Sequence, residues 1–139
     1  MKWEECYPGQ IVYIKHFDEF TKEFLGHPYL IIQHQGFKSR HKNNIICLRI
    51  TSKIDDLEDK ILIQPSKCNG LAKISAILVN SEHLFDVSQG TLIGQLEYEM
   101  FKYVENERKK FLENQFEEWD IAYENIKKYQ DRHRRKGDI

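Results

Sequence analysis

Six histidines and three cysteines are the side chains in this sequence best suited to proton transfer, nucleophilic attack or metal binding. The histidines at positions 16, 27, 34 and 41 have no spacing typical of metal ligands, and no Cys-x-x-Cys pair is present. A Gly-rich phosphate loop and a Gly-x-Ser-x-Gly nucleophile elbow are also missing. We therefore expect no metal site and no cofactor, and three reduced, mostly buried cysteines, Cys6, Cys47 and Cys68.

A second candidate for chemistry is a group of basic side chains in the polar stretch of residues 34–44. Lys38, Arg40, His41 and Lys42 follow one another closely there. Such side chains bind phosphate groups in many proteins, although a charged run in a loop is more often simply solvated. The sequence pattern leaves both roles open.

Five short apolar runs predict the strands that would position these side chains. Each run is rich in β-branched residues and is bounded by Gly, Pro, Asn or Asp. Because no helical period separates such short strands, we expect a strongly curved antiparallel sheet or small barrel. Residues 16–25 mix charge and Phe without clean periodicity, which predicts a long, mobile loop that lies over a site. The predicted strands cover residues 11–14, 29–32, 45–51, 60–63 and 75–79.

From residue 97 onward the apolar period changes to that of a helix. Hydrophobic side chains recur every three or four residues between Phe101 and Ile126. No Pro or Gly lies between Leu96 and Gly137, so we expect one very long helix or two helices broken near residues 113–115. Residues 1–96 are thus predicted to form the barrel. Residues 97–139 are predicted to form a helical segment of the same single domain, packed on the barrel or on a partner.

The overall composition is typical of a globular protein. Of the 139 residues, 40% are hydrophobic and 31% are charged. The apolar runs are far shorter than the ~20 residues of a membrane span, and the N-terminus is unlike a signal peptide, so we expect a cytoplasmic protein without membrane contact. The net charge of −1 conceals a bipolar tail. Residues 97–124 carry nine acidic and four basic side chains, whereas residues 127–136 carry one acidic and six basic side chains.

Five motifs follow one another in an order that carries a family resemblance. The first is Gly-Gln-Ile-Val-Tyr-Ile at residues 9–14, and the second is His-Pro-Tyr-Leu-Ile-Ile at residues 27–32. A strand at residues 45–53 ends in Ile-Thr-Ser-Lys and is the best match. Gly-Leu-x-x-x-Ser begins at residue 70, and Gly-Gln-Leu at residues 94–96 precedes the helix. Together, over roughly residues 8–112, these motifs resemble the MazF/PemK family of ribonuclease toxins.

The resemblance implies an SH3-like barrel of about five to seven antiparallel strands that forms a homodimer and is neutralised by an antitoxin protein. Such toxins cut single-stranded RNA without metal, using the 2′-hydroxyl as nucleophile and leaving a 2′,3′-cyclic phosphate. The reaction needs a base near the 2′-oxygen, an acid near the leaving 5′-oxygen, and donors or a cation for the charged phosphorane. Our first hypothesis is therefore a MazF/PemK-like endoribonuclease toxin.

The family's usual functional pair is an Arg before the Pro of the second motif and the Thr of Ile-Thr-Ser. Thr51 retains the Thr, whereas His27 occupies the Arg position. His27 can take or give a proton near neutral pH, but it cannot hold phosphate with a permanent bidentate charge. It is therefore either a catalytic acid or base, or a residue that only caps its strand. Thr51 and Ser52 likewise either function in catalysis or merely satisfy backbone groups.

The resemblance also implies a set of RNA-binding residues. Phe37 would stack on a base, and the basic stretch around it would contact phosphates. His83 occupies a position where family members often carry polar or basic side chains near the RNA groove, and Glu82 is a candidate to orient it or His27. The predicted RNA-binding residues are Ser52, Lys53, Phe37, Lys38, Arg40, His41, Lys42 and His83.

Two other functions stay open at this point. A barrel of the same fold that has lost catalysis would bind RNA or another protein, and the missing Arg favours this alternative. A gyrase-binding relative of the fold would act by protein contact, but the C-terminal Lys-Gly-Asp-Ile does not match the Trp-Gly-Ile-type ending expected of it. The extension of residues 113–139 would widen a dimer interface, fill the groove that an antitoxin segment would otherwise occupy, or help to dock RNA.

Overall fold

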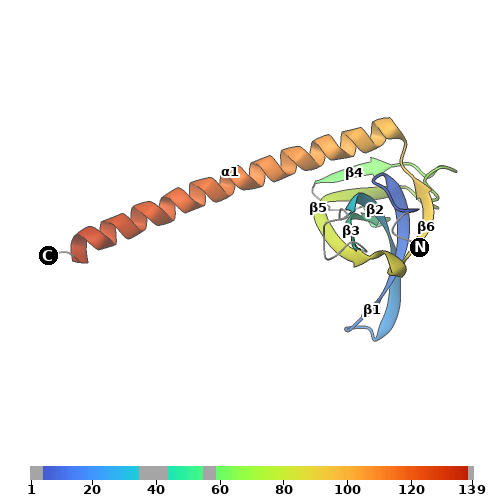
Figure 1. Cartoon of the computed structure of the whole chain (residues 1–139), viewed down its shortest axis with the longest axis horizontal. Coiled ribbons are helices and arrows are strands. Elements are labelled where there is room, and N and C mark those ends of the chain that lie inside the picture. The colour runs from blue at the N-terminus through green and yellow to red at the C-terminus, as the bar shows by residue number, and fades with distance from the viewer. Residues whose placement is uncertain (1–4, 35–43, 55–58, 138–139) are drawn as a thin grey trace.

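The computed structural model describes residues 5–34, 44–54 and 59–137. It consists of one antiparallel sheet followed by a single long helix, with a short 3₁₀ helix, Val87–Gln89, before the last strand (Figure 1). The basic residues of the polar stretch 34–44, Lys38, Arg40, His41 and Lys42, lie outside the described residues together with Phe37. The elements are β1 Gln10–Asp18, β2 Glu23–His34, β3 Asn44–Thr51, β4 Lys60–Ile63, β5 Ser75–Asp86, β6 Gly90–Gln95 and α1 Tyr98–Gly137.

The six strands pair in the order β4-β5-β3-β2-β1-β6. Register shifts interrupt three of the pairings, at Ile11 in β1, at Ile31 in β2 and at Leu48 in β3. Such bulges bend a strand and increase its twist, and here they accompany a sheet that curls into a half-barrel (Figure 1). The predicted fold class, a small curved antiparallel barrel with a long C-terminal helix, is confirmed.

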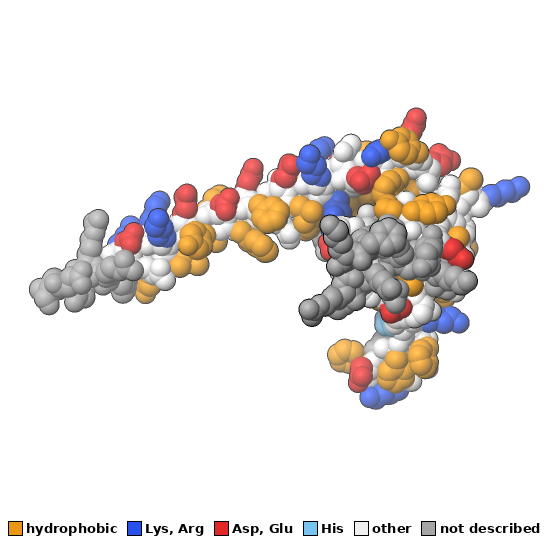
Figure 2. Space-filling model, in the orientation of Figure 1, with side chains coloured by type: hydrophobic (Ala, Val, Ile, Leu, Met, Phe, Trp, Pro, Cys, Tyr) orange, Lys and Arg blue, Asp and Glu red, His pale blue; other side chains and the backbone are white. Residues whose placement is uncertain are grey.

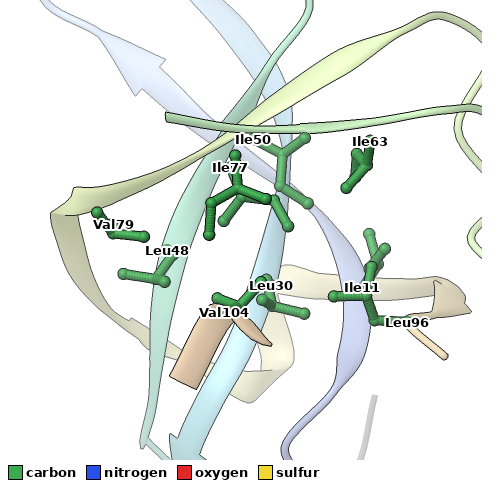
Figure 3. Packing of buried hydrophobic residues seen from close by; sticks show 10 residues of the cluster. Ile11, Leu30, Leu48, Ile50, Ile63, Ile77, Val79, Leu96 and Val104 are labelled. Atoms are coloured by element: carbon green, nitrogen blue, oxygen red, sulfur yellow. The ribbon is translucent and has the colours of Figure 1, made fainter. Parts of the chain in front are cut away.

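The central strands are buried on both faces, which explains their continuous apolar runs. One cluster lies between the curled strands and the start of α1, and includes Leu30, Leu48 and Val104 (Figure 3). The alternate residues of the same strands form a second cluster on the opposite face, with Tyr29 and Cys47 among its members. Two stacked layers of buried side chains therefore fix the register of β2 against β3.

The prediction of a long, mobile loop at residues 16–25 is wrong. Strands β1 and β2 continue as a paired hairpin as far as Asp18 and Glu23. The rings of Phe17 and Phe24 face each other across it, edge to face, with centroids 5.4 Å apart. Cross-strand aromatic pairs stabilise a hairpin even where apolar and polar residues do not alternate strictly. The sequence pattern therefore did not predict this hairpin arm, residues 16–25, as strand.

The five predicted strands are present, and β6 adds a sixth that the apolar pattern did not predict. Gly90 and Gly94 lie within β6, and glycines weaken a strand signal because they offer no side chain to pack. Strand β5 also continues seven residues beyond the predicted end, to Asp86.

Helix α1 is one unbroken helix of 40 residues, which settles the choice between one helix and two. At 1.5 Å per residue it is about 60 Å long. Its first four turns pack on the sheet through Met100, Phe101, Val104 and Phe111, and Arg108 donates a hydrogen bond to the Glu82 carboxylate of β5. Beyond Leu112 the helix leaves the sheet and projects away from it (Figure 1). Within the described part of the chain, no helix is both long and apolar enough to cross a membrane.

Candidate functional site

A cavity of about 590 Å³ lies beside the first half of β2 and the end of β3, and the loop that precedes β5 also lines it. Its wall combines backbone and apolar surface with side chains able to bind anions or move protons. Among the described residues, no group of three or more His, Cys, Asp and Glu side chains is placed to hold a metal ion. The polar residues that line the cavity are Tyr13, His27, Arg49, Thr51, Ser52, Lys53, Lys73 and Ser75.

The pairing of β2 with β3 brings His27 and Thr51 together. In that ladder Tyr29 lies opposite Arg49. Continuing the antiparallel register by two residues places His27 opposite Thr51, on the same face as Tyr29 and Arg49. Both residues line the cavity. The two residues singled out by sequence therefore border the same cavity from neighbouring strands.

The roof of the cavity is a loop held by Asn69. The Asn69 side-chain oxygen accepts hydrogen bonds from the backbone amides of Ser66 and Leu71, at 2.9 and 3.0 Å, and its amide group donates to the Gln64 carbonyl at 2.8 Å. Gly70 follows with a φ of +68°, and an added Cβ there would lie 2.1 Å from the Ile93 carbonyl oxygen. Only glycine fits this close approach, which explains the Gly at residue 70 of the fourth motif.

His27 lies in a partly buried, electropositive environment. Its pKa is lowered from the ordinary value, first by burial and then by the charges of Arg49, His16 and Lys53. The His16 ring lies beside it, with the two ring centroids 6.0 Å apart. A lowered pKa keeps the His27 imidazole neutral near pH 7, which is the form that accepts a proton.

Arg49 is a charged cavity residue that sequence reasoning missed, and Lys73 is a second. Arg49 lies within an otherwise apolar strand, β3, and is half-buried. Its Nε is buried with no hydrogen-bond partner, and among the described residues no carboxylate forms an ion pair with it. An uncompensated guanidinium in a cavity wall is a natural anion site. The signal was present, since a lone charge inside a strand of Ile, Leu and Cys is unusual.

Thr51, Ser52 and Lys53 form the lip of the cavity. The Thr51 hydroxyl accepts a hydrogen bond from the Lys53 backbone amide at 3.1 Å, so it also serves the local turn. Accepting this bond leaves the hydroxyl proton free to donate. Ser52 and Lys53 are exposed, and both line the cavity with Thr51.

His83 does not line this cavity. Its ring stacks on Phe85 and meets the edge of Tyr29, and its Nε2 lies 2.9 Å from the Ser81 hydroxyl. Its pKa is lowered by burial, by Arg49 and by His16. His83 therefore shares the electropositive environment of His27 without lining the cavity. The suggestion that Glu82 orients His83 or His27 is wrong, because Glu82 pairs with Arg108 of α1 instead.

The sequence pattern of PemK-like, MazF-like toxins of type II toxin-antitoxin systems matches residues 7–112. The chain belongs to this family. The match spans the whole sheet, the cavity and the part of α1 that packs on the sheet. The projecting part of α1 lies beyond what the PemK/MazF family pattern covers.

Two crystal structures share the PemK/MazF fold with this chain. The form III crystal structure of MazE-MazF from Deinococcus radiodurans has a TM-score of 0.61 at 12% identity, over 77% of this chain and 95% of that chain. Form II gives the same TM-score and coverage at 13% identity. Mycobacterium tuberculosis toxin MazF-mt6 has a TM-score of 0.49 at 19% identity, over 80% and 97% of the two chains. No curated protein sequence matches the chain.

Proposed function

We propose that this PemK/MazF-family protein is an endoribonuclease toxin that cleaves single-stranded RNA by attack of a 2′-hydroxyl, without metal. The observation that carries the proposal is the shared cavity of His27, Arg49 and Thr51. These residues offer a proton acceptor, a permanent cation and a hydroxyl donor, which are groups that phosphoryl transfer from RNA requires. The family position that usually holds Arg is occupied by His27, and Arg49 on the neighbouring strand supplies the charge.

In this mechanism the scissile phosphate lies against Arg49. Neutral His27 accepts the proton of the 2′-hydroxyl as the 2′-oxygen bonds to phosphorus. The charge that develops on the phosphoryl oxygens is stabilised by Arg49 and by the Thr51 hydroxyl. The bond to the 5′-oxygen then breaks, and we assign its protonation to an ammonium group of the cavity wall, Lys53 or Lys73. The products are a 2′,3′-cyclic phosphate and a free 5′-hydroxyl.

The proposal includes protein partners. The Deinococcus radiodurans structures named above contain MazF together with MazE. By analogy, we propose an antitoxin protein that neutralises this chain and a homodimer as the active form. RNA would approach the positive face that Arg49, Lys53 and Lys73 create around the cavity.

The experiment that tests this function is incubation of the purified protein with a long single-stranded RNA in EDTA, followed by mapping of the new 5′ ends. We expect discrete cuts from wild type and none from His27→Ala or Thr51→Ala. Lys15→Ala is the matched control, because Lys15 is an exposed residue of β1 that does not line the cavity. It should leave the cleavage pattern unchanged.

Two results would oppose the proposal. Intact RNA at high protein concentration, with RNA retained on the protein, would identify a binding module that has lost catalysis. Equal cleavage by wild type and by both cavity variants would place the active site elsewhere.

A further inference from the structure

The projecting part of α1 carries a row of large apolar side chains that nothing in the chain covers within the described residues. Phe116, Trp119, Tyr123 and Ile126 are 59%, 66%, 71% and 56% exposed. With Leu112 they occupy about 80° of the helix circumference at 3.6 residues per turn. Figure 2 shows this row of hydrophobic side chains along one side of the helix, beyond the sheet. We call these five residues the aromatic stripe.

An apolar stripe of this size on a solvated helix indicates a partner. The spacing of the stripe alternates between four and three residues, which is the pattern of a helix that packs lengthwise against another helix. A lone projecting helix of some 25 residues is only marginally stable in water. Burial of the stripe against a second helix would supply the missing stabilisation.

The charges of α1 are complementary to those of a second copy of the same helix that runs in the opposite direction. Residues 113–124 contain five acidic and no basic side chains, whereas residues 127–136 contain six basic and one acidic. In a parallel pair of two copies, each acidic segment would face another acidic segment. In an antiparallel pair, each acidic segment would face a basic one.

The residues along one edge of the stripe show the same change from acidic to basic. Glu113, Asp120 and Lys127 are spaced by seven residues along one edge of the stripe, and the next position, 134, is Arg. This edge therefore changes from acidic to basic at its midpoint. When two copies pair in opposite directions, Asp120 of one copy lies level with Lys127 of the other, where opposite charges attract.

We propose that α1 is an oligomerisation helix that pairs antiparallel with α1 of a second copy of this chain through the aromatic stripe, centred near residues 121–125. The paired segments extend from the point where α1 leaves the sheet, at Leu112, to its end at Gly137. The two half-barrels then lie at opposite ends of a rod of about 40 Å. The proposal is independent of the RNA chemistry, because no residue of the stripe lines the cavity.

Disulfide trapping tests both the contact and its direction in the full-length chain. The background is Cys68→Ser, because Cys68 is exposed whereas Cys6 and Cys47 are buried. One protein then carries Phe116→Cys and a second carries Gln130→Cys, which continues the stripe by one further turn. Each protein is oxidised alone and as an equal mixture, and disulfide dimers are separated under non-reducing conditions.

Antiparallel pairing predicts a dimer that forms in the mixture and is largely absent from each protein alone. Positions 116 and 130 lie nearly level in that arrangement, whereas two copies of either position are about 20 Å apart along the axis. The matched control is Ile121→Cys, which is 62% exposed but lies on the opposite face of the helix. The Ile121→Cys protein should form no disulfide dimer with itself, although residue 121 is near the proposed centre of the antiparallel pair.

Two outcomes would overturn the proposal. Dimers formed by each protein with itself, and no mixed dimer of the two proteins in the mixture, would establish parallel pairing. No disulfide in any combination, from proteins whose helix content equals that of wild type, would show that the stripe serves a different partner. Association through the half-barrels does not produce the mixture-specific pattern, because the disulfides report only on the stripe.

Discussion

The imidazole rings of His16 and His27 lie 6.0 Å apart on the paired strands β1 and β2. His16 lies at the base of the hairpin arm and His27 in the cavity wall, and Arg49 adds a permanent positive charge beside them. The positive neighbours disfavour protonation of His27. Together with burial, which is the larger cause, these neighbours lower the pKa of His27 and keep its imidazole neutral at physiological pH.

This environment makes folding stability depend on pH. The folded-state pKa of His27 and of His83 lies below the ordinary value of 6.5, so the unfolded chain binds more protons in the window between the two values. The free energy of unfolding should therefore fall as pH drops below about 6.5 and level off below the folded-state pKa. Urea unfolding between about pH 5 and pH 7.5 measures this. In His27→Gln the slope should be smaller, and an equal slope in both proteins would argue against a shifted His27.

Arg49→Gln should alter both protonation and cleavage. Removal of the guanidinium raises the pKa of His27 and of His83 toward the ordinary value, because its charge is among the causes that lower both. NMR titration of the histidine C–H resonances checks this directly. Cleavage should fall by about 100- to 1,000-fold, as for the loss of one donor to a charged transition state. Lys15→Gln is the control, and unchanged histidine titration in Arg49→Gln would remove Arg49 from the site.

The core that positions β2 and β3 should be sensitive to truncation. Leu48 is fully buried in the cluster that faces α1, so Leu48→Ala should lower the free energy of unfolding by about 2–5 kcal/mol. Leu84→Ala is the matched control, since Leu84 is 58% exposed, and its effect should stay within about 0.5 kcal/mol. Denaturant melts of both variants provide the comparison. Similar losses from the two substitutions would contradict the assigned core.

The three cysteines should differ sharply in reactivity. Burial, with a smaller contribution from Cys6, raises the pKa of Cys47 to about 12, and Cys6 is itself buried. Cys68 is exposed on the loop before β5. A disulfide reagent at about pH 8 should therefore label one thiol in the native protein and three after denaturation. Cys68→Ser should abolish the native reaction, and rapid labelling of a second thiol would show that the buried clusters open readily.

Much of the fold could be predicted from the sequence because its apolar runs are short and their boundaries are clear. The runs at residues 29–32 and 45–51 became the central strands, and the Pro-free and Gly-free stretch after Leu96 became one helix. The hairpin arm could not be predicted in this way. It depends on the Phe17–Phe24 contact between strands, and a contact of that kind leaves no periodic signal in the sequence.

The candidate site was predicted in part. The resemblance pointed to His27 and Thr51, and the strand register brings both into one cavity. Arg49 was overlooked because no known motif marks a charged residue within a β-strand. Its importance depends on the cavity that it lines, which only the structure shows. His83 was grouped with the site from its position in the sequence, but its side chain packs against Tyr29 and Phe85 instead. Which strand faces share a cavity depends on bulges and curl, which local sequence does not encode.

The central claim, attack by a 2′-hydroxyl in the cavity of His27, Arg49 and Thr51, is tested most directly by one substitution in the RNA. A short oligonucleotide that contains a mapped cleavage site is compared, in EDTA, with the same oligonucleotide carrying a single 2′-deoxynucleotide on the 5′ side of the scissile bond. The account predicts cleavage of the first to a 2′,3′-cyclic phosphate and complete resistance of the second at that bond, because the nucleophile is missing. Cleavage of the deoxy-substituted bond at the same rate would contradict the account.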